Sequence, residues 1–423
     1  NEDENVDQNS VGENLVYSKI DYSVDANDIA FLQFSSGTTG LRKGIPVSHR
    51  ALMSQLRSFG VAFELDRHDH IVSWLPLYHD IGLIAWCLLP ILMRVPVTML
   101  DPVAWSANPV SLFAAVEINR ATRVFMPNFA FNHLAYTVSD SPRYDLSSLR
   151  SLVNCSEPCR KYSFDLFLDR FQSWGVSENS LQTCYALAEA VFAVSYSRKM
   201  PTTLPSEDLV KKEGCEYLFV DDLSGFLSCG FVLPNTEVRI LDEGGRVLDQ
   251  GQLGEIAISG ESVFSGYFID GIQVPNSLCS SDFFRTGDLG LIHNGELYVL
   301  GRISDVIIVN GRNVFAGDIE MLVAKADGVK KGRVLASAIG NKERGSEDIL
   351  VLFESLCDMH SQIDVYRHIR RLVAEHFGLA CCVVALPPGF LVKTSSGKIS
   401  RRLSVLRYFE WEASKLKGGK GEQ

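Results

Sequence analysis

A loop of hydroxyl-bearing residues and glycines follows the first apolar run of the chain and ends in a basic pair, between Phe31 and Gly44. Its glycines allow the backbone to turn several N–H groups toward one point, its hydroxyls add donors, and its lysine adds a mobile positive charge. These features predict a phosphate-binding loop. The residues expected to contact phosphate are Ser35, Ser36, Gly37, Thr38, Thr39, Gly40 and Lys43.

The loop differs from the P-loop of nucleoside triphosphatases. Arg42 stands where that motif requires its second glycine, directly before the lysine. A plain turn is the alternative interpretation of the loop on its own, so the rest of the chain has to decide between the two.

Three further residues have chemistry that their surroundings make specific. Glu189 lies in an otherwise apolar run, where an unpaired carboxylate is costly, which favours a bound cation over a surface position. Asp288 follows Gly287, and an ionised carboxylate can only accept hydrogen bonds. Lys398 follows a glycine in a loop of small residues, where a mobile cation could reach developing negative charge.

Glu189, Asp288 and Lys398 lie in three of five segments that follow the loop along the chain. The five segments are Leu75–Leu83, Asn154–Pro158, Tyr185–Glu189, Phe284–Gly290 with Gly301–Asp305, and Lys393–Arg402. Together with the loop they resemble the adenylate-forming superfamily of acyl-CoA synthetases, luciferases and peptide-synthetase adenylation domains. Within it the chain most resembles the fatty acyl-AMP ligases, from about Ile29 to Phe409. The resemblance implies ATP-dependent, Mg²⁺-assisted activation of a fatty acid to acyl-AMP, with release of pyrophosphate.

The resemblance also implies roles for single residues. His79 and Asp80 would border the carboxylate substrate, and Asn128 and Phe129 would face the acyl tunnel. Lys398 would bridge the attacking carboxylate and the α-phosphate, and Glu189 would ligate Mg²⁺, whereas Lys393 reads as a surface charge. The adenine and ribose contacts would come from Ser156, Glu157, Pro158, Tyr185, Asp288 and Arg302.

Two positions depart from the family pattern. Ala186 replaces the usual glycine, which narrows the space beside Tyr185. Ser304 stands at the expected hinge, where the family usually has aspartate or lysine. The C-terminal domain of the family swings about this hinge between two half-reactions, and the serine suggests a different equilibrium between the two poses.

The pattern of apolar runs predicts an α/β fold. Short strands alternate with amphipathic helices up to about residue 227, which predicts a parallel sheet with crossover helices. Ser48 is expected to cap the helix after the loop and to place its positive dipole end nearby. The expected divisions are an acidic lead-in at 1–28, a large domain at 29–300 with a small β-barrel-like part from about 228, a hinge at 301–305, a mobile α+β domain at 306–410 and a tail at 411–423.

Composition narrows the function classes. The net charge of −11 over 423 residues argues against a nucleic-acid partner. The most apolar stretch, Ile81 to Leu100, is broken by Pro90, Arg94 and Pro96 and fails as a membrane span. Ten scattered cysteines fit reduced thiols, so we expect a cytoplasmic protein.

The acceptor of the acyl group stays open at this point. Two features resemble the fatty acyl-AMP ligases and favour a carrier-protein phosphopantetheine thiol over free CoA as the acceptor. They are a long polar stretch from Arg198 to Phe226 and the sequence motif Asn310 to Asn313. An acyl- or aryl-CoA ligase is the alternative, and a non-catalytic nucleotide-binding subunit is a second one. A basic surface for an acidic carrier protein, or merely a solvated face, would comprise Arg312, Lys330, Lys331 and Arg333.

Relatives carry on the order of 150 residues before the phosphate loop. We therefore expect one of two situations: either the chain is one part of a split or cut polypeptide, and an associated N-terminal fragment or partner completes the sheet, or the large domain is built smaller than in the relatives.

Overall fold

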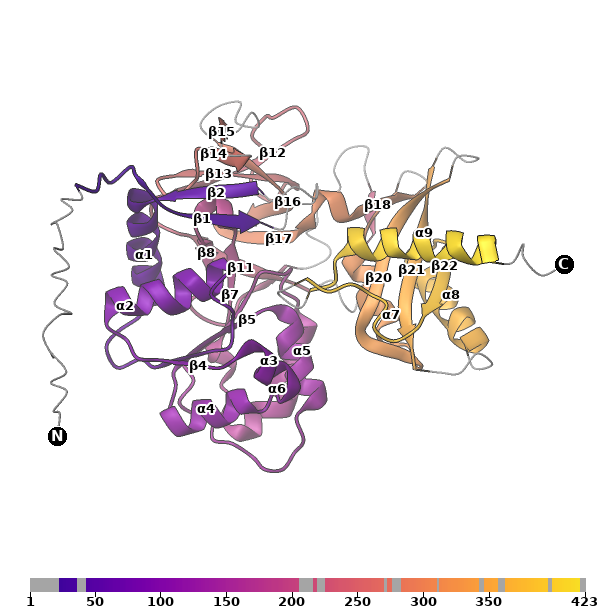
Figure 1. Cartoon of the computed structure of the whole chain (residues 1–423), viewed down its shortest axis with the longest axis horizontal. Helices are drawn as coiled ribbons and strands as arrows, with labels where there is room; N and C mark the ends of the chain where they lie inside the picture. The colour runs from indigo at the N-terminus through magenta and orange to yellow at the C-terminus, as the bar shows by residue number, and fades with distance from the viewer. Residues whose placement is uncertain are drawn as a thin grey trace, which may run out of the picture.

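A long mixed sheet forms the centre of the larger of two lobes that Figure 1 shows joined by the chain near β17 and β18. The structure is a computed structural model that describes residues 23–35, 43–204, 216–218, 225–269, 272–275, 283–309, 312–341, 346–356, 362–394 and 398–418.

The first half of the sheet is parallel, as the alternation of strands and helices predicts. Its strands lie in the order β4-β3-β5-β6-β7 and are β3 (Ile71–Ser73), β4 (Val97–Met99), β5 (Arg123–Met126), β6 (Ser151–Cys155) and β7 (Leu181–Ala186). The helices between them are η1 (Ile81–Leu88), α2 (Leu89–Met93), α3 (Pro102–Ala107), α4 (Ser111–Asn119), α5 (Asn128–Thr137), α6 (Lys161–Phe171) and the short turns η2 (Gln172–Trp174) and η3 (Glu178–Ser180). Because the strands are parallel, their carboxyl ends share one edge of the sheet.

The second half of the sheet is antiparallel and continues directly from β7. Its strands are β8 (Ala193–Tyr196), β11 (Phe226–Val232), β12 (Thr236–Leu241), β13 (Gly254–Gly260), β16 (Phe284–His293) and β17 (Glu296–Arg302), with β9 (Thr203–Leu204) beside β11. Among the described strands no pairing closes this half into a barrel. The part expected to be barrel-like is therefore an open extension of the main sheet.

The segment around the phosphate loop is a strand pair. β1 (Ile29–Ser35) and β2 (Lys43–Ser48) are antiparallel, and β14 (Gly266–Ile269) and β15 (Ile272–Pro275) extend them to four strands. Ser48 caps α1 (His49–Phe63) as expected, with its Oγ accepting from the N–H of Ala51 at 3.1 Å. The strand β2 separates Lys43, at the end of the loop, from the N-terminus of α1 by about 17 Å of extended chain. The expected contribution of the α1 dipole to phosphate binding stays a prediction.

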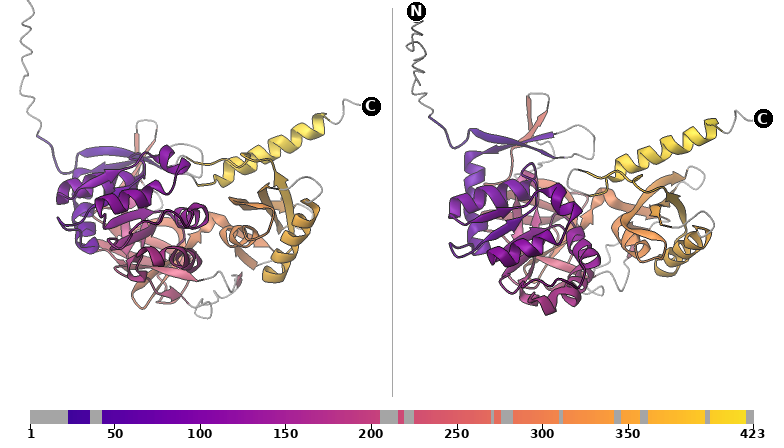
Figure 2. Two further views of the ribbon diagram at one scale, coloured as in Figure 1. Left: turned by 90° about the horizontal axis from the view of Figure 1, so that it is seen from below. Right: turned by 60° about the horizontal axis from the view of Figure 1, so that its bottom comes forward.

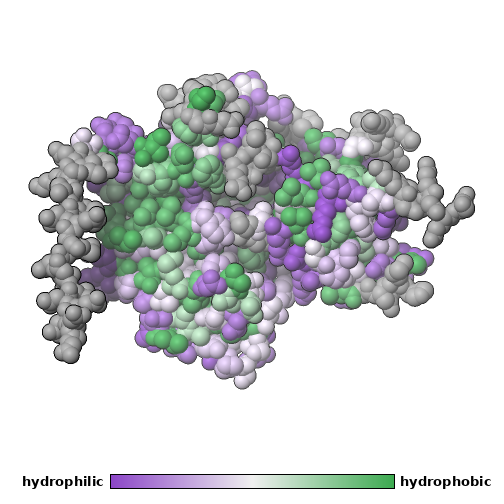
Figure 3. Space-filling model, viewed as in Figure 1, coloured by the Kyte–Doolittle hydropathy of each residue, from purple (hydrophilic) through white to green (hydrophobic). Residues whose placement is uncertain are grey.

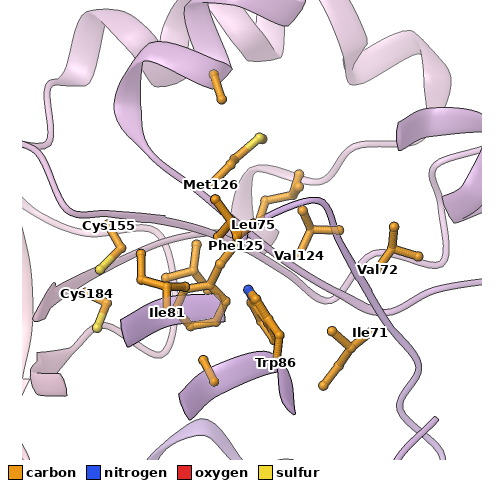
Figure 4. Close-up of a cluster of buried hydrophobic side chains, with 14 of the residues drawn as sticks. Ile71, Val72, Leu75, Ile81, Trp86, Val124, Phe125, Met126, Cys155 and Cys184 are labelled. Atoms are coloured by element: carbon orange, nitrogen blue, oxygen red, sulfur yellow. The ribbon is translucent and has the colours of Figure 1, made fainter. Parts of the chain in front are cut away.

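The core of the large lobe lies between the parallel strands and the helices that cover them (Figure 4). Trp86 of η1 is fully buried, and its ring centroid lies 4.5 Å from that of Phe125 on β5. Cys155, the last residue of β6, pairs with Cys184 near the end of β7. All seven cysteines in the described part of the chain are free thiols.

The smaller lobe is an α+β unit, as expected. Its strands are β18 (Val306–Val309), β19 (Arg312–Phe315), β20 (Val329–Asn341), β21 (Ser346–Ser355) and β22 (Cys381–Leu386), with β10 (Glu216–Leu218) joining β19. Its helices are α7 (Ala316–Val323), α8 (Gln362–Phe377) and α9 (Arg401–Gly418), and the views in Figure 2 show α9 extending away from the lobe. The helix α9 continues past residue 411, where the sequence had suggested a tail.

One face of the large lobe exposes apolar side chains over α1 and α2, where Figure 3 shows hydrophobic residues gathered. Val61 and Ile91 are each about two-thirds exposed, and a groove of about 460 Å³ lies between Val61, Leu65, Leu92 and Met93. The expectation of an additional polypeptide partner stays a prediction. No helix within the described ranges is both long and apolar enough to span a membrane.

Candidate active site

The β1–β2 hairpin holds the two ends of the phosphate loop together. Ser35 ends β1 and pairs with Lys43, the first residue of β2. Ser36, Gly37, Thr38, Thr39 and Gly40 lie outside the described residues. The Lys43 Nζ lies 4.9 Å from the centroid of the Tyr267 ring, close enough for a cation–π contact.

Glu189 contacts the hydroxyl of the same tyrosine. It lies in the single turn η4 (Ala188–Ala190) that follows β7, and its half-buried carboxylate accepts a hydrogen bond from the Tyr267 hydroxyl at 3.0 Å. The main chain also fixes this turn, because the N–H of Phe264 donates to the carbonyl of Glu189 at 2.8 Å. Tyr267 on β14, a strand paired with β2, thus connects the expected metal ligand to the phosphate-loop lysine.

The expected adenine platform follows β6, and Tyr185 is the next-to-last residue of the neighbouring strand β7. Ser156 has a positive φ of 72°, which turns the chain out of the strand and exposes Ser156 and Pro158. The Glu157 carboxylate turns away from this surface and accepts from the N–H of Phe129 at 2.9 Å, at the N-terminus of α5. There its charge complements the helix dipole.

Asn128 and Phe129, expected at the acyl tunnel, therefore adjoin the platform. Asn128 begins α5, and its Oδ1 accepts from the Nδ2 of Asn154 at 2.8 Å. The half-buried Phe129 ring packs edge-on against Trp74, with centroids 6.2 Å apart.

Asp288, Arg302 and Tyr185 form one polar cluster. The Tyr185 hydroxyl donates to Asp288 Oδ2 at 2.5 Å, and Arg302 Nε lies 2.8 Å from Asp288 Oδ1. The pairing of β16 with β17 places Asp288 directly opposite Arg302. Burial raises the pKa of Asp288 above its usual value, although the Arg302 charge and the Tyr185 hydrogen bond oppose the shift. Burial, reinforced by the Asp288 charge, also raises the pKa of Tyr185.

His79 and Asp80 lie in the turn between β3 and η1. The His79 Nε2 is buried and has no hydrogen-bond partner among the described residues, so it can donate to or accept from a ligand. Burial, followed by the Lys398 charge, lowers the pKa of His79 and favours the neutral ring at pH 7. The Asp80 carboxylate accepts from the N–H of Ile81 at 2.9 Å and caps η1, and burial raises its pKa.

Lys398 reaches this site from the small lobe. The next residue, Ile399, forms an antiparallel β-bridge with Lys393. The N–H of Thr394 donates to the Lys398 carbonyl at 2.7 Å, which closes a tight turn. The Lys398 Nζ donates to the carbonyl of Ser156 on the platform loop. Lys393 is exposed, and the expected hinge residue Ser304 is an exposed member of the turn η6 (Ile303–Asp305).

The structure therefore gathers most of the predicted residues at the carboxyl edge of the parallel strands and the adjoining antiparallel strands. The expected basic surface stays a prediction. Arg312 donates to the carbonyl of Phe377, whereas Lys330 and Arg333 face the buried Glu354, and Lys331 lies over the Tyr136 ring at 3.8 Å.

Sequence reasoning missed Tyr267 and a buried pair, Arg160 and Asp318. A tyrosine beside a glycine in a short strand is a common pattern that carries no chemical signal by itself. Arg160 and Asp318 gave no signal either, because they lie 158 positions apart and neither belongs to a recognisable motif.

The side chains at the site fit a metal ion that takes one ligand from the protein and the rest from water and phosphate. No group of three or more His, Cys, Asp or Glu side chains is arranged to hold a metal in the part of the chain that the structure describes. The half-buried Glu189 is a single carboxylate beside the phosphate-loop lysine. Mg²⁺ typically binds one or two carboxylates and takes its remaining ligands from water and phosphate, so this arrangement suits it.

Comparisons with known proteins agree with this geometry. The model of the family described as AMP-binding enzyme matches residues 1–268. A putative acyl-CoA synthetase of Caulobacter vibrioides is 30% identical over 398 residues, which cover 91% of this chain and 69% of the relative. The medium-chain-fatty-acid–[acyl-carrier-protein] ligase JamA of Moorena producens is 28% identical, covering 92% and 70%.

The chain is also similar in structure to adenylate-forming enzymes. A structure from a study of fatty acyl-adenylate ligases of E. coli and L. pneumophila superposes with a TM-score of 0.82 at 29% identity. The match covers 92% of this chain and 72% of that chain. The mixed α/β architecture described above is thus the fold of an adenylate-forming enzyme.

Proposed function

This chain belongs to the AMP-binding enzyme family, and we propose that it activates a fatty acid with ATP to an acyl-adenylate and passes the acyl group to a carrier-protein thiol. The observation that carries the proposal is the position of Lys398. This cation enters from the small lobe and contacts the Ser156 carbonyl, beside the surface assigned to adenine. A module that only bound nucleotide would have no need of it.

The nucleotide would lie across the carboxyl edge of the sheet. Asp288 accepts from the ribose hydroxyls, and Arg302 holds that carboxylate in place through its 2.8 Å ion pair. The residues around Ser156 and Tyr185 present two surfaces for adenine. Lys43 and the phosphate loop would contact the β- and γ-phosphates, and Glu189 would hold Mg²⁺, which would neutralise phosphate charge.

The first step brings two anions together, and the residues of this chain reduce their repulsion. One oxygen of the fatty acid carboxylate attacks the α-phosphorus of ATP, a new P–O bond forms, and the bond between the α-phosphorus and the bridging oxygen breaks to release pyrophosphate. Lys398 stabilises the charge that develops at the α-phosphate, and the neutral His79 borders the carboxylate. Positioning carries most of the rate, because no proton transfer is required.

The second step transfers the acyl group. A phosphopantetheine thiolate attacks the acyl carbonyl carbon, a thioester forms, and AMP leaves with the electron pair of the broken C–O bond. Lys398 has to withdraw to admit the thiol, so the small lobe would rotate about Ser304. The relationship to a carrier-protein ligase such as that of Moorena producens supports a protein-bound acceptor. The Caulobacter relative supports CoA as the alternative acceptor.

Carboxylate-dependent ATP/pyrophosphate exchange tests the first step. Wild-type protein should exchange label with medium- and long-chain fatty acids, and Lys398→Ala should lose at least about a hundredfold of the rate. Lys393→Ala is the matched control, because Lys393 is exposed on the same turn and should keep wild-type exchange. Binding of ATP without any exchange in the wild type would instead indicate a nucleotide-binding subunit.

The acceptor is tested separately with chemically prepared acyl-adenylate. The proposal predicts faster thioester formation with a phosphopantetheinylated carrier protein than with CoA. Efficient acyl-CoA formation would replace the carrier-protein assignment with that of a CoA ligase, while leaving the first step intact.

A further inference from the structure

A buried ion pair connects the two lobes beside the candidate site. Arg160 precedes α6 in the large lobe, and Asp318 lies in the first turn of α7 in the small lobe. Arg160 Nη2 and Asp318 Oδ1 are 2.5 Å apart, and the two side chains are only 5% and 1% exposed. The guanidinium of Arg160 also lies 3.6 Å from the centroid of the Phe226 ring, so its position is fixed on the large-lobe side.

Neighbouring contacts extend the junction between the lobes. Lys331 and Lys325 of the small lobe lie over the rings of Tyr136 and Tyr162 of the large lobe, at 3.8 Å and 5.4 Å from the centroids. The two tyrosine hydroxyls are 2.7 Å apart and form a hydrogen bond with each other. These contacts are partly exposed, whereas the Arg160–Asp318 pair is buried.

The same loop of the large lobe also receives Lys398. Ser156, whose carbonyl accepts from the lysine, stands four positions before Arg160. On the small-lobe side, Glu320 lies two positions after Asp318 and binds Arg401, which follows Lys398 by three positions. The loop at 156–160 thus contacts the small lobe at two places, at Asp318 on α7 and at Lys398.

The energetics of the pair favour a role in placing the lobe over a role in stabilising it. Burial lowers the pKa of Arg160 and raises that of Asp318, and their mutual attraction opposes both shifts. Arg160 Nη1 and Asp318 Oδ2 have no hydrogen-bond partner among the described residues. An incompletely satisfied buried pair adds little net stability, yet removing one partner leaves a costly unpaired charge. At a junction between lobes that charge can regain water if the lobes separate, without either lobe unfolding.

We propose that Arg160 and Asp318 are positioning residues for adenylation, which hold the small lobe in the pose that delivers Lys398 and which separate when the lobe turns for acyl transfer. This inference rests on the function proposed above. It adds the contact that sets the balance between the two poses, a contact that touches neither substrate nor nucleotide.

The experiment compares both half-reactions in three variants of the full chain. Asp318→Asn keeps the shape but removes the charge. The double variant Arg160→Met with Asp318→Leu replaces the pair with apolar groups of similar volume, a change that commonly preserves a buried contact. Asp364→Asn is the control, because it breaks an exposed ion pair with Arg367 on α8 of the same lobe.

Asp318→Asn should slow pyrophosphate exchange by at least about tenfold. Only molecules in the adenylation pose carry out this exchange, so its rate falls in proportion to the fraction of molecules in that pose. Acyl transfer from prepared acyl-adenylate should stay within about twofold of the wild type or become faster. The double variant should recover most of the exchange, and Asp364→Asn should match the wild type. Equal losses in both half-reactions, or unchanged exchange in Asp318→Asn, would overturn the inference.

Hydrogen–deuterium exchange without substrates provides a readout independent of activity. Asp318→Asn should increase labelling of the amides at the start of α6 and in α7, while the core strands β5 and β6 keep their protection. Unchanged labelling at both helices would refute the junction role even if activity fell. If Asp318→Asn increases this labelling but the wild type shows no pyrophosphate exchange, the role of the ion pair at the junction between the lobes would stand. The proposed adenylation function would then be rejected.

Discussion

The hydroxyl of Tyr267 donates a 3.0 Å hydrogen bond to the carboxylate of Glu189, while the ring of the same residue lies against the ammonium of Lys43. One side chain therefore spaces the expected metal ligand from the expected phosphate ligand. The pairing of Phe268 with Gly44 ties this arrangement to the backbone of the phosphate loop.

Tyr267→Phe should lower the rate of pyrophosphate exchange by about tenfold, because a hydrogen bond to a charged group contributes about 1.5–3 kcal/mol. The ring and its contact with Lys43 remain, so the Mg²⁺ concentration needed for half-maximal rate should rise more than the KM for ATP. A titration with Mg²⁺ at saturating ATP and fatty acid measures this. Tyr408→Phe removes an equivalent 3.0 Å bond to Glu412 on α9 and should leave exchange unchanged. An unaltered Mg²⁺ titration in Tyr267→Phe would contradict the positioning of Glu189.

Nucleotide binding should weaken in mild acid because of Asp288. Its ionised carboxylate accepts from both ribose hydroxyls more strongly than the protonated group can, and burial raises its pKa above the ordinary value of 3.8. As pH falls, the carboxylate is therefore protonated earlier than an exposed aspartate, and affinity for AMP should decrease while the fold is intact. Calorimetric titrations across the acid range measure the decrease. Asp288→Asn should bind AMP more weakly at neutral pH and should lack this pH dependence; a parallel pH dependence in the variant would assign it to another group.

Local sequence patterns predicted the parallel half well because each signal lies within one element. The boundaries of β5 and α4 agree with the apolar runs Arg123–Met126 and Ser111–Asn119. Ser156 and Tyr185 lie at the same edge of the sheet because each follows one of the paired residues Cys155 and Cys184 on neighbouring parallel strands. The strand β2 escaped notice because Gly44 and Pro46 argue against a strand. Arg160 and Asp318 are 158 positions apart, and a contact across two lobes leaves no periodicity in the sequence.

The turn that carries His79 and Asp80 depends on close backbone packing at Gly82. A Cβ atom at this position would lie 2.0 Å from the carbonyl oxygen of Pro76, which cannot move without displacing the turn. Gly82→Ala should therefore raise the KM for the fatty acid and lower kcat, and should shift η1 in a crystal structure of the variant. Gly340→Ala is the control, since a Cβ there meets no atom within 4 Å. Wild-type kinetics in Gly82→Ala would show that the turn does not shape the acid site.

The stability of the large lobe should depend on Asp69, far from the site at the opposite ends of the strands. Its fully buried carboxylate binds Arg123 through two bonds of 3.0 and 3.2 Å and accepts from Thr122 at 2.6 Å. Burial by itself would raise the pKa of Asp69, but the hydrogen bonds from Arg123 and Thr122 outweigh it and lower the pKa below 3.8. Asp69→Asn leaves the Arg123 charge buried and should cost about 3–5 kcal/mol of unfolding free energy.

The lowered pKa fixes the sign of the acid dependence of this contribution. The stabilisation is fully present above the unfolded-state pKa near 3.8 and is lost as pH falls through the lower folded-state value. Urea unfolding of the wild type should therefore show a loss of stability below about pH 4 that Asp69→Asn reduces. Glu237→Gln, which breaks the exposed ion pair with Arg239, should change the midpoint little at any pH. Equal acid sensitivity of Asp69→Asn and the wild type would move the responsible carboxylate elsewhere in the fold.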